Sequence, residues 1–110
     1  MARFDINQRL YKKVNGSSSE TLDYVPPNGE RIWVVNMGVS SSQVPDTVAC
    51  IAWGNPLAPM EILLSSYSEA LHKEVNLELI GDGVKALRIY LANDLTEFAY
   101  MGGFVQGVRL

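Results

Sequence analysis

Apolar and polar residues alternate along much of this chain, with the period of two that is typical of β-strands with one buried face. The clearest case is residues 74–91, EVNLELIGDGVKALRIYL, where the alternation runs on both sides of Gly81-Asp82-Gly83. Alternation on both sides of an Asp-Gly pair is typical of a β-hairpin. We therefore predict two paired antiparallel strands joined by a turn at residues 81–83.

Other apolar runs, separated by turn residues, predict further strands. Pro26-Pro27-Asn28-Gly29 is a firm turn signal, because proline has no amide for a sheet ladder. Gly102-Gly103 inside an apolar run indicates a bulge, a kink or a close backbone approach. The runs that we interpret as strands are 21–25, 30–39, 47–53, 60–67, 97–101 and 104–110.

The spacing of these runs sets the fold class. Short strands with a turn signal every 8–12 residues or so are typical of sandwiches and barrels. We predict an all-β protein of about eight strands, an antiparallel β-sandwich of jelly-roll-like topology. One segment has an alternative: residues 59–75 also fit a helix, although two serines and a tyrosine in its middle favour a strand.

The N-terminal segment has a mixed pattern and a charge of its own. Residues 1–16 carry a net charge of +3, whereas residues 17–110 carry −6. We interpret residues 1–19 as an extended arm with a Ser-rich linker at 17–19, and residues 20–110 as the sandwich domain. A first strand with solvated edges is the alternative. Four basic side chains are too few to indicate nucleic acid as the partner.

Length and composition fit one folded domain. The 110 residues include 47% apolar and 19% charged side chains, and the net charge is −3. The apolar runs are much shorter than the roughly 18 residues that a transmembrane helix needs, and the N-terminus lacks a signal-peptide pattern. We expect no membrane association.

The residue types needed for metal binding or catalysis are scarce. Cys50 and His72 are the only cysteine and histidine, so neither a disulfide nor a transition-metal site is expected. Asp46, Asp82 and Asp94 lie in predicted loops and could contribute to a calcium site, but their spacing matches no EF-hand pattern, and aspartate is common in turns. No serine has the glycine-flanked setting of a nucleophile. We expect a protein that is not an enzyme and that has no cofactor.

The aromatic residues suggest binding rather than chemistry. Trp33 and Trp53 lie in the most apolar strands and are expected in the core. Tyr90, near Arg88, is the best candidate for an exposed ring, and both residue types are enriched at protein interfaces. An exposed ring also suits a carbohydrate-binding module or a receptor-binding head, with Tyr90, Tyr100 or a tryptophan as its platform for a glycan.

The run Ile80–Asp94, followed by Gly102-Gly103-Phe104, resembles small β-sandwich structural proteins of tailed bacteriophages. These are decoration, cement or accessory virion proteins, and the resemblance covers roughly residues 30–110. It implies a non-enzymatic protein that is made in the host cytoplasm and located in the virion. It also implies a homo-oligomer that binds the viral capsid or other virion proteins.

This hypothesis assigns partner-binding residues to the arm and to one sandwich surface. Basic arm residues would contact acidic patches, and apolar arm residues would fill grooves of a neighbouring subunit. Two sandwich residues would add to the contact. The predicted partner-binding residues are Arg3, Phe4, Ile6, Arg9, Leu10, Lys12, Lys13, Arg88 and Tyr90.

Overall fold

The computed structural model describes residues 4–41, 47–66 and 70–110. These residues contain eight β-strands. The described part of the chain has no helix long and apolar enough to cross a membrane. The strands are β1 Ile6–Val14, β2 Ser18–Tyr24, β3 Arg31–Ser41, β4 Thr47–Gly54, β5 Glu61–Ser66, β6 Ala70–Ile80, β7 Ala86–Asn93 and β8 Ala99–Arg109.

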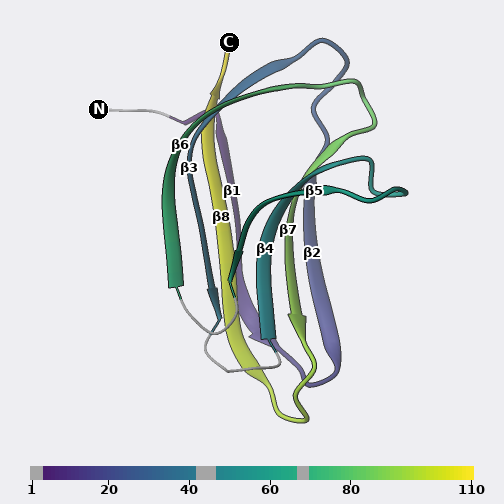
Figure 1. The fold of residues 1–110 in the computed structure, drawn as a ribbon, viewed down its shortest axis with the longest axis vertical. Helices are drawn as coiled ribbons and strands as arrows, with labels where there is room; N and C mark the ends of the chain where they lie inside the picture. Colours follow the sequence, from purple (N-terminus) through teal and green to yellow (C-terminus); the bar gives the residue numbers. More distant parts are fainter. Residues whose placement is uncertain (1–3, 42–46, 67–69) are drawn as a thin grey trace.

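The strands form two antiparallel sheets of four strands each, packed face to face (Figure 1). Sheet A has the order β1-β8-β3-β6, and sheet B has the order β2-β7-β4-β5. Strand β1 thus pairs with β8, β2 with β7, β3 with β6 and β4 with β5. This nested pairing, folded across two sheets, is the strand order of a jelly roll. The predicted antiparallel β-sandwich with jelly-roll topology is confirmed.

The core lies between the sheets and is built from alternate residues of each strand. Sheet B contributes Ile51 of β4 and Ile89 of β7, and sheet A contributes Val34, Met37 and Val105, all essentially inaccessible to solvent. The strand assignment for residues 60–67 holds where the chain is described, because β5 covers 61–66 and β6 begins at residue 70. The helical alternative for residues 59–75 is therefore wrong.

The hairpin predicted at residues 81–83 is wrong. Strand β6 lies at the edge of sheet A beside β3, whereas β7 lies in sheet B between β2 and β4. Residues 81–85 therefore turn a corner from one sheet to the other. The Asp82 carboxylate shapes this corner by accepting hydrogen bonds from the backbone N–H groups of Val84 (2.9 Å) and Lys85 (2.7 Å). An Asp-Gly turn between alternating segments indicates a chain reversal, but it does not specify whether the segments share a sheet.

The prediction of an extended N-terminal arm is also wrong, and the alternative prediction of a first strand is confirmed. Residues 6–14 form β1, which pairs with β8 from Ile6 opposite Gly107 to Val14 opposite Ala99. Ile6 and Val14 are fully buried in the core. Because β2 begins at Ser18, residues 17–19 are not a linker. The described residues thus form one sandwich, and deletion of residues 1–16 would remove part of its core.

Candidate functional site

The outer face of sheet A carries aromatic rings that lie over glycines of neighbouring strands. Tyr11 of β1 is opposite Gly102 of β8, and Phe104 of β8 is opposite Gly38 of β3. A Cβ atom added at Gly102 would overlap the Tyr11 ring, and one added at Gly38 would overlap the Phe104 ring. Each ring therefore lies directly on the backbone of the next strand. Cross-strand contacts between an aromatic ring and glycine stabilise such sheets.

Three further rings extend this surface. His72 of β6 lies 5.9 Å from Phe104 between ring centroids, and Phe98 meets Tyr100 edge-on at 5.5 Å. Tyr11 and Tyr100 are 53% and 64% exposed, so both offer ring surface to a ligand. We call this surface the aromatic face and define it by Tyr11, His72, Phe98, Tyr100 and Phe104.

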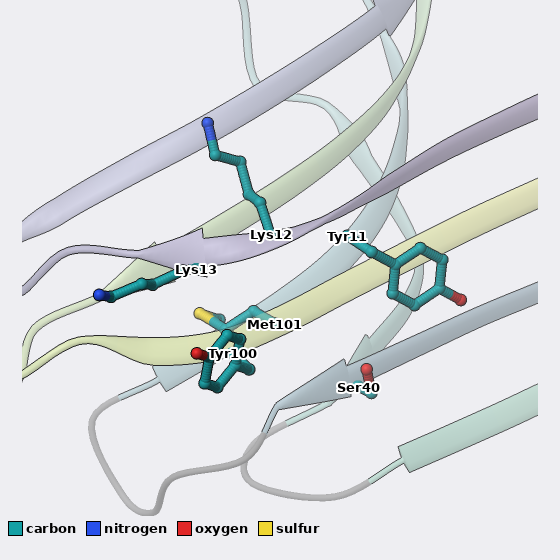
Figure 2. A pocket seen from close by; sticks show the side chains of 6 residues that line it. All are labelled: Tyr11, Lys12, Lys13, Ser40, Tyr100 and Met101. Atoms are coloured by element: carbon teal, nitrogen blue, oxygen red, sulfur yellow. The ribbon is translucent and has the colours of Figure 1, made fainter.

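An open hollow of about 350 Å³ lies beside Tyr11 and Tyr100. Figure 2 shows the Tyr11 ring over β8, the Tyr100 ring further along the same strand, and Ser40 on the adjacent strand β3. Gly102 lies between these side chains in the strand ladder and adds no side chain of its own. The residues that line the hollow are Tyr11, Lys12, Lys13, Ser40, Tyr100 and Met101.

Two cations border the aromatic face. The Arg9 guanidinium carbon lies 5.8 Å from the centroid of the Phe104 ring, and the Lys13 ammonium lies 4.1 Å from that of Phe98. Among the described residues, neither Arg9 nor Lys13 forms an ion pair with a carboxylate. Lys12, in contrast, contacts Glu20 of β2 at 3.0 Å. The β1 side of the aromatic face is therefore positive, although the whole chain has a net charge of −3.

The outer face of sheet B is apolar at its centre. In β4, Ala49, Ile51 and Trp53 point into the core, so Cys50 and Ala52 point outward. They lie opposite Tyr90 and Arg88 of β7. A shallow hollow of about 210 Å³ is lined here by side chains of β4, β5, β7 and the loop before β5. We call this surface the apolar face and define it by Cys50, Ala52, Met60, Ile62 and Tyr90.

Arg88 is fixed at the border of the apolar face by Asp23 of β2. Its Nε donates to Asp23 Oδ1 at 2.7 Å, and its Nη2 donates to Oδ2 at 2.8 Å. This two-point contact raises the pKa of Arg88. Burial raises the pKa of the Cys50 thiol, and the nearby Arg88 charge opposes that rise only in part. Cys50 is thus a protonated, poorly accessible thiol at neutral pH.

Four of the predicted partner-binding residues lie on these two faces. Arg9 and Lys13 border the aromatic face, and Tyr90 and Arg88 lie on or beside the apolar face. The sequence hypothesis grouped these four residues in one partner-binding surface, whereas the structure places two of them on each of two different faces.

The other predicted partner-binding residues have different surroundings. Ile6 is fully buried, so it cannot contact a partner, and Leu10 packs against the core. Lys12 is paired with Glu20. Phe4, just before β1, is half-buried, and Arg3 lies outside the described residues.

The sequence hypothesis missed Tyr11, Phe104 and Ile62. The alternation in residues 6–14 places Tyr11 on the same strand face as Arg9 and Lys13, which was a usable signal. The glycines beneath Tyr11 and Phe104 depend on strand register, which the sequence does not give. Trp53 is in the core as predicted. Trp33 is not, because it lies opposite Glu78 and Val108 on the outer side of sheet A and is half-buried.

The residues considered for metal binding or catalysis do not assemble. Within residues 4–41, 47–66 and 70–110, no three His, Cys, Asp or Glu side chains are placed to hold a metal ion. Asp46 lies outside the described residues. Hydrogen bonds from the backbone N–H groups of Lys85 and Val84 lower the pKa of Asp82. His72 lies on the outer side of sheet A and Cys50 on that of sheet B, so they cannot act as a nucleophile and its base.

The two sheets and their order define a jelly-roll β-sandwich, a class that includes viral capsid and lectin domains. The crystal structure of the Yersinia pseudotuberculosis-derived mitogen YPM is similar to this chain, with a TM-score of 0.50. The identity is 10%, over 91% of this chain and 84% of the mitogen chain. The crystal structure of PirA aligns with a TM-score of 0.44 and 11% identity, over 94% of this chain and 96% of PirA.

The likeness to YPM shows the fold alone. No family model matches the chain, and no curated protein sequence matches it. The resemblance to bacteriophage structural proteins therefore stays a prediction from the sequence.

Proposed function

We propose that this protein is a non-enzymatic virion structural protein, of the decoration or cement type, that binds a viral shell through its apolar face. The observation that carries this proposal is the composition of β4, the central strand of that face. Its outward residues Cys50 and Ala52 are small and apolar, where a solvated sheet would have polar side chains. They are only 8% and 3% exposed, because the larger side chains around the hollow partly cover them. A shallow apolar surface of this kind is typical of a protein interface.

The residues around β4 support a protein partner. Ile62 of the edge strand β5 lies opposite Ala52 and is 57% exposed, so it extends the apolar surface of β4 into one contiguous patch. Tyr90 and Arg88 flank β4, and both residue types are enriched in the parts of interfaces that contribute most binding energy. Because Asp23 already holds Arg88 in place, binding would cost little side-chain entropy there.

The jelly-roll fold and the bacteriophage resemblance agree with a role in a virion, located there after synthesis in the host cytoplasm. In this proposal, several copies bind the shell as a homo-oligomer, each through its apolar face. The contact uses neither nucleic acid nor membrane, and no cofactor is involved. The arm-mediated contact predicted from the sequence is replaced by a contact through sheet B, because β1 is held in sheet A.

The test uses particles assembled from the major shell protein that is encoded in the same genome. The full chain should co-sediment with these particles, and Ile62→Glu should weaken binding about tenfold or more, because a charge would be buried in the contact. Ile80→Glu is the matched control, since Ile80 is also 57% exposed but lies at the end of β6 in sheet A. Equal binding by the wild type and both variants would contradict the proposal, as would equal loss in both.

A further inference from the structure

The aromatic face has a second set of properties that shell binding through sheet B does not use. Its rings protrude, its hollow is open, and its cations lack carboxylate partners among the described residues. From this combination we propose that the hollow beside Tyr11 and Tyr100 binds a negatively charged saccharide. The sugar would carry carboxylate or sulfate groups, and the site acts independently of the apolar face.

The geometry of Tyr11 provides the first step of the argument. Its ring lies on the backbone at Gly102, so one side of the ring is covered and the other is free. A ring held in this way loses little freedom when a ligand stacks on it, because it is already ordered. The C–H groups of a pyranose face are apolar, and a flat aromatic surface suits them.

Tyr100 extends the binding surface along β8. It is 64% exposed, and its ring is supported at one edge by Phe98. Tyr11 lies opposite Gly102 in the ladder, and Tyr100 lies two residues before Gly102 on β8. Figure 2 shows the two tyrosine side chains at neighbouring places along this strand. The space there, about 350 Å³, is open to solvent and suits a short segment of a linear saccharide. Ser40 and the two tyrosine hydroxyls provide hydrogen-bonding groups for sugar hydroxyls.

Charge then selects among saccharides. Arg9 and Lys13 lie two residues on either side of Tyr11, on the same outward side of β1. Each contacts an aromatic ring, and neither is neutralised by a described carboxylate. A carboxylate or sulfate on a sugar stacked over Tyr11 would lie between these two cations. A neutral saccharide would leave both charges unused, which favours an acidic ligand.

The experiment measures binding of the full chain by titration calorimetry at low salt. The probes are a sulfated heparin hexasaccharide, a carboxylated oligogalacturonate, a neutral dextran oligosaccharide and a poly-glutamate peptide. We expect one or both acidic saccharides to bind, more weakly as salt is added, and the neutral saccharide to bind at least tenfold more weakly. No binding of either acidic saccharide would overturn the proposal. Poly-glutamate binding as tightly as the saccharides would also overturn it, because the site would then recognise charge alone.

Variants locate the site. Tyr100→Ala should weaken saccharide binding about tenfold through lost stacking, and Lys13→Gln about fivefold through lost ion pairing. The matched controls are Tyr90→Ala, a ring on the apolar face, and Lys85→Gln, an exposed cation in the corner between the sheets. Both controls should bind like the wild type.

Unchanged binding by the Tyr100→Ala and Lys13→Gln variants would overturn the proposal even if a saccharide binds elsewhere. These two side chains are exposed, so the variants are expected to fold, and circular dichroism checks this. Because Ile62→Glu should not affect saccharide binding, failure of the shell proposal and failure of the saccharide proposal are separable.

Discussion

The outer faces of the two sheets are built on opposite principles. In sheet A, large aromatic rings lie over glycines, so the surface is uneven: aromatic side chains protrude beside an open hollow. In sheet B, the central positions Cys50 and Ala52 are small, and their larger neighbours Ile62 and Tyr90 form a shallow apolar surface. The contrast shows how the same four-stranded framework can present either a hollow for a ligand chain or a flat contact for a protein.

Charge separates the two faces as clearly as shape does. The guanidinium beside the apolar face, that of Arg88, is neutralised by Asp23 within the sheet. The cations on the aromatic face, Arg9 and Lys13, contact rings and leave their charge available. A pre-formed ion pair suits a surface that becomes buried, because burial of an unpaired charge is costly. An unpaired cation suits a site that takes its counter-charge from a ligand.

The largest expected effect comes from disrupting the contact between the Tyr11 ring and Gly102. Gly102→Ala would place a Cβ within the Tyr11 ring and should lower the free energy of unfolding by about 2 kcal/mol, the usual scale of overpacking. In a Tyr11→Ala background the same substitution should cost less than about 1 kcal/mol, because the clashing ring is gone. Urea denaturation of the four proteins in this double-mutant cycle measures the difference.

The neighbouring glycine provides the control. Gly103 faces the core, where an added Cβ would lie 2.8 Å from Ile89 Cγ2. Gly103→Ala should therefore destabilise the protein equally with and without the Tyr11 ring. If the cost of Gly102→Ala is the same in both backgrounds, the ring does not lie over Gly102 as described.

A smaller effect distinguishes the ion pairs of the two sheets. Asp23→Asn breaks a two-point contact to Arg88 whose side chains are only 25% and 29% exposed, and it should cost about 1 kcal/mol. Glu78→Gln breaks the similar contact to Arg31 on sheet A, where Arg31 is 55% exposed and water screens the charges. Its cost in urea denaturation should be clearly smaller. A larger cost for Glu78→Gln would reverse this order and contradict the contrast in burial.

The sequence predicted well what depends on local pattern. Alternation identified the segment around Ile89 as a strand, because a period of two is a direct consequence of one buried face. The segments around Trp33 and Ile51 were identified by short apolar runs of β-forming residues between turn signals. The Gly102-Gly103 pair was expected to mark a bulge, a kink or close backbone approach, and both glycines are closely approached by side chains.

The pairing of strands could not be predicted in the same way. Residues 74–80 and 86–91 carry the pattern of a hairpin, yet their partners, β3 for one and β2 and β4 for the other, are distant in sequence. The candidate sites have the same origin. Tyr11 meets Gly102, and Cys50 meets Tyr90, only because the jelly-roll order brings them together. A local pattern contains no information on such contacts, whereas it does indicate which segments form strands.

The smallest expected effect is on the stability of the fold at acid pH. It tests whether solvent-exposed hydrogen bonds to carboxylates contribute to that stability. Hydrogen bonding to Arg31 lowers the pKa of Glu78 below its ordinary value of 4.5. The folded state therefore binds this proton less readily than the unfolded state. The resulting stability is present above pH 4.5 or so and is lost as pH falls through the lowered pKa. The pKa of Asp82 is likewise lowered from its ordinary value of 3.8, because the N–H groups of Lys85 and Val84 donate hydrogen bonds to its carboxylate.

Melting temperatures measured between pH 6 and pH 3 in about 0.1 M salt separate the contributions of Glu78 and Asp82. Glu78→Gln should flatten the upper part of the acid-induced decline, since the ordinary pKa at which the unfolded chain protonates is 4.5 for Glu78 and 3.8 for Asp82. Asp82→Asn should flatten only the lower part, and it keeps an oxygen that can accept the turn's N–H bonds. If neither variant changes the profile, solvent screening cancels both contacts.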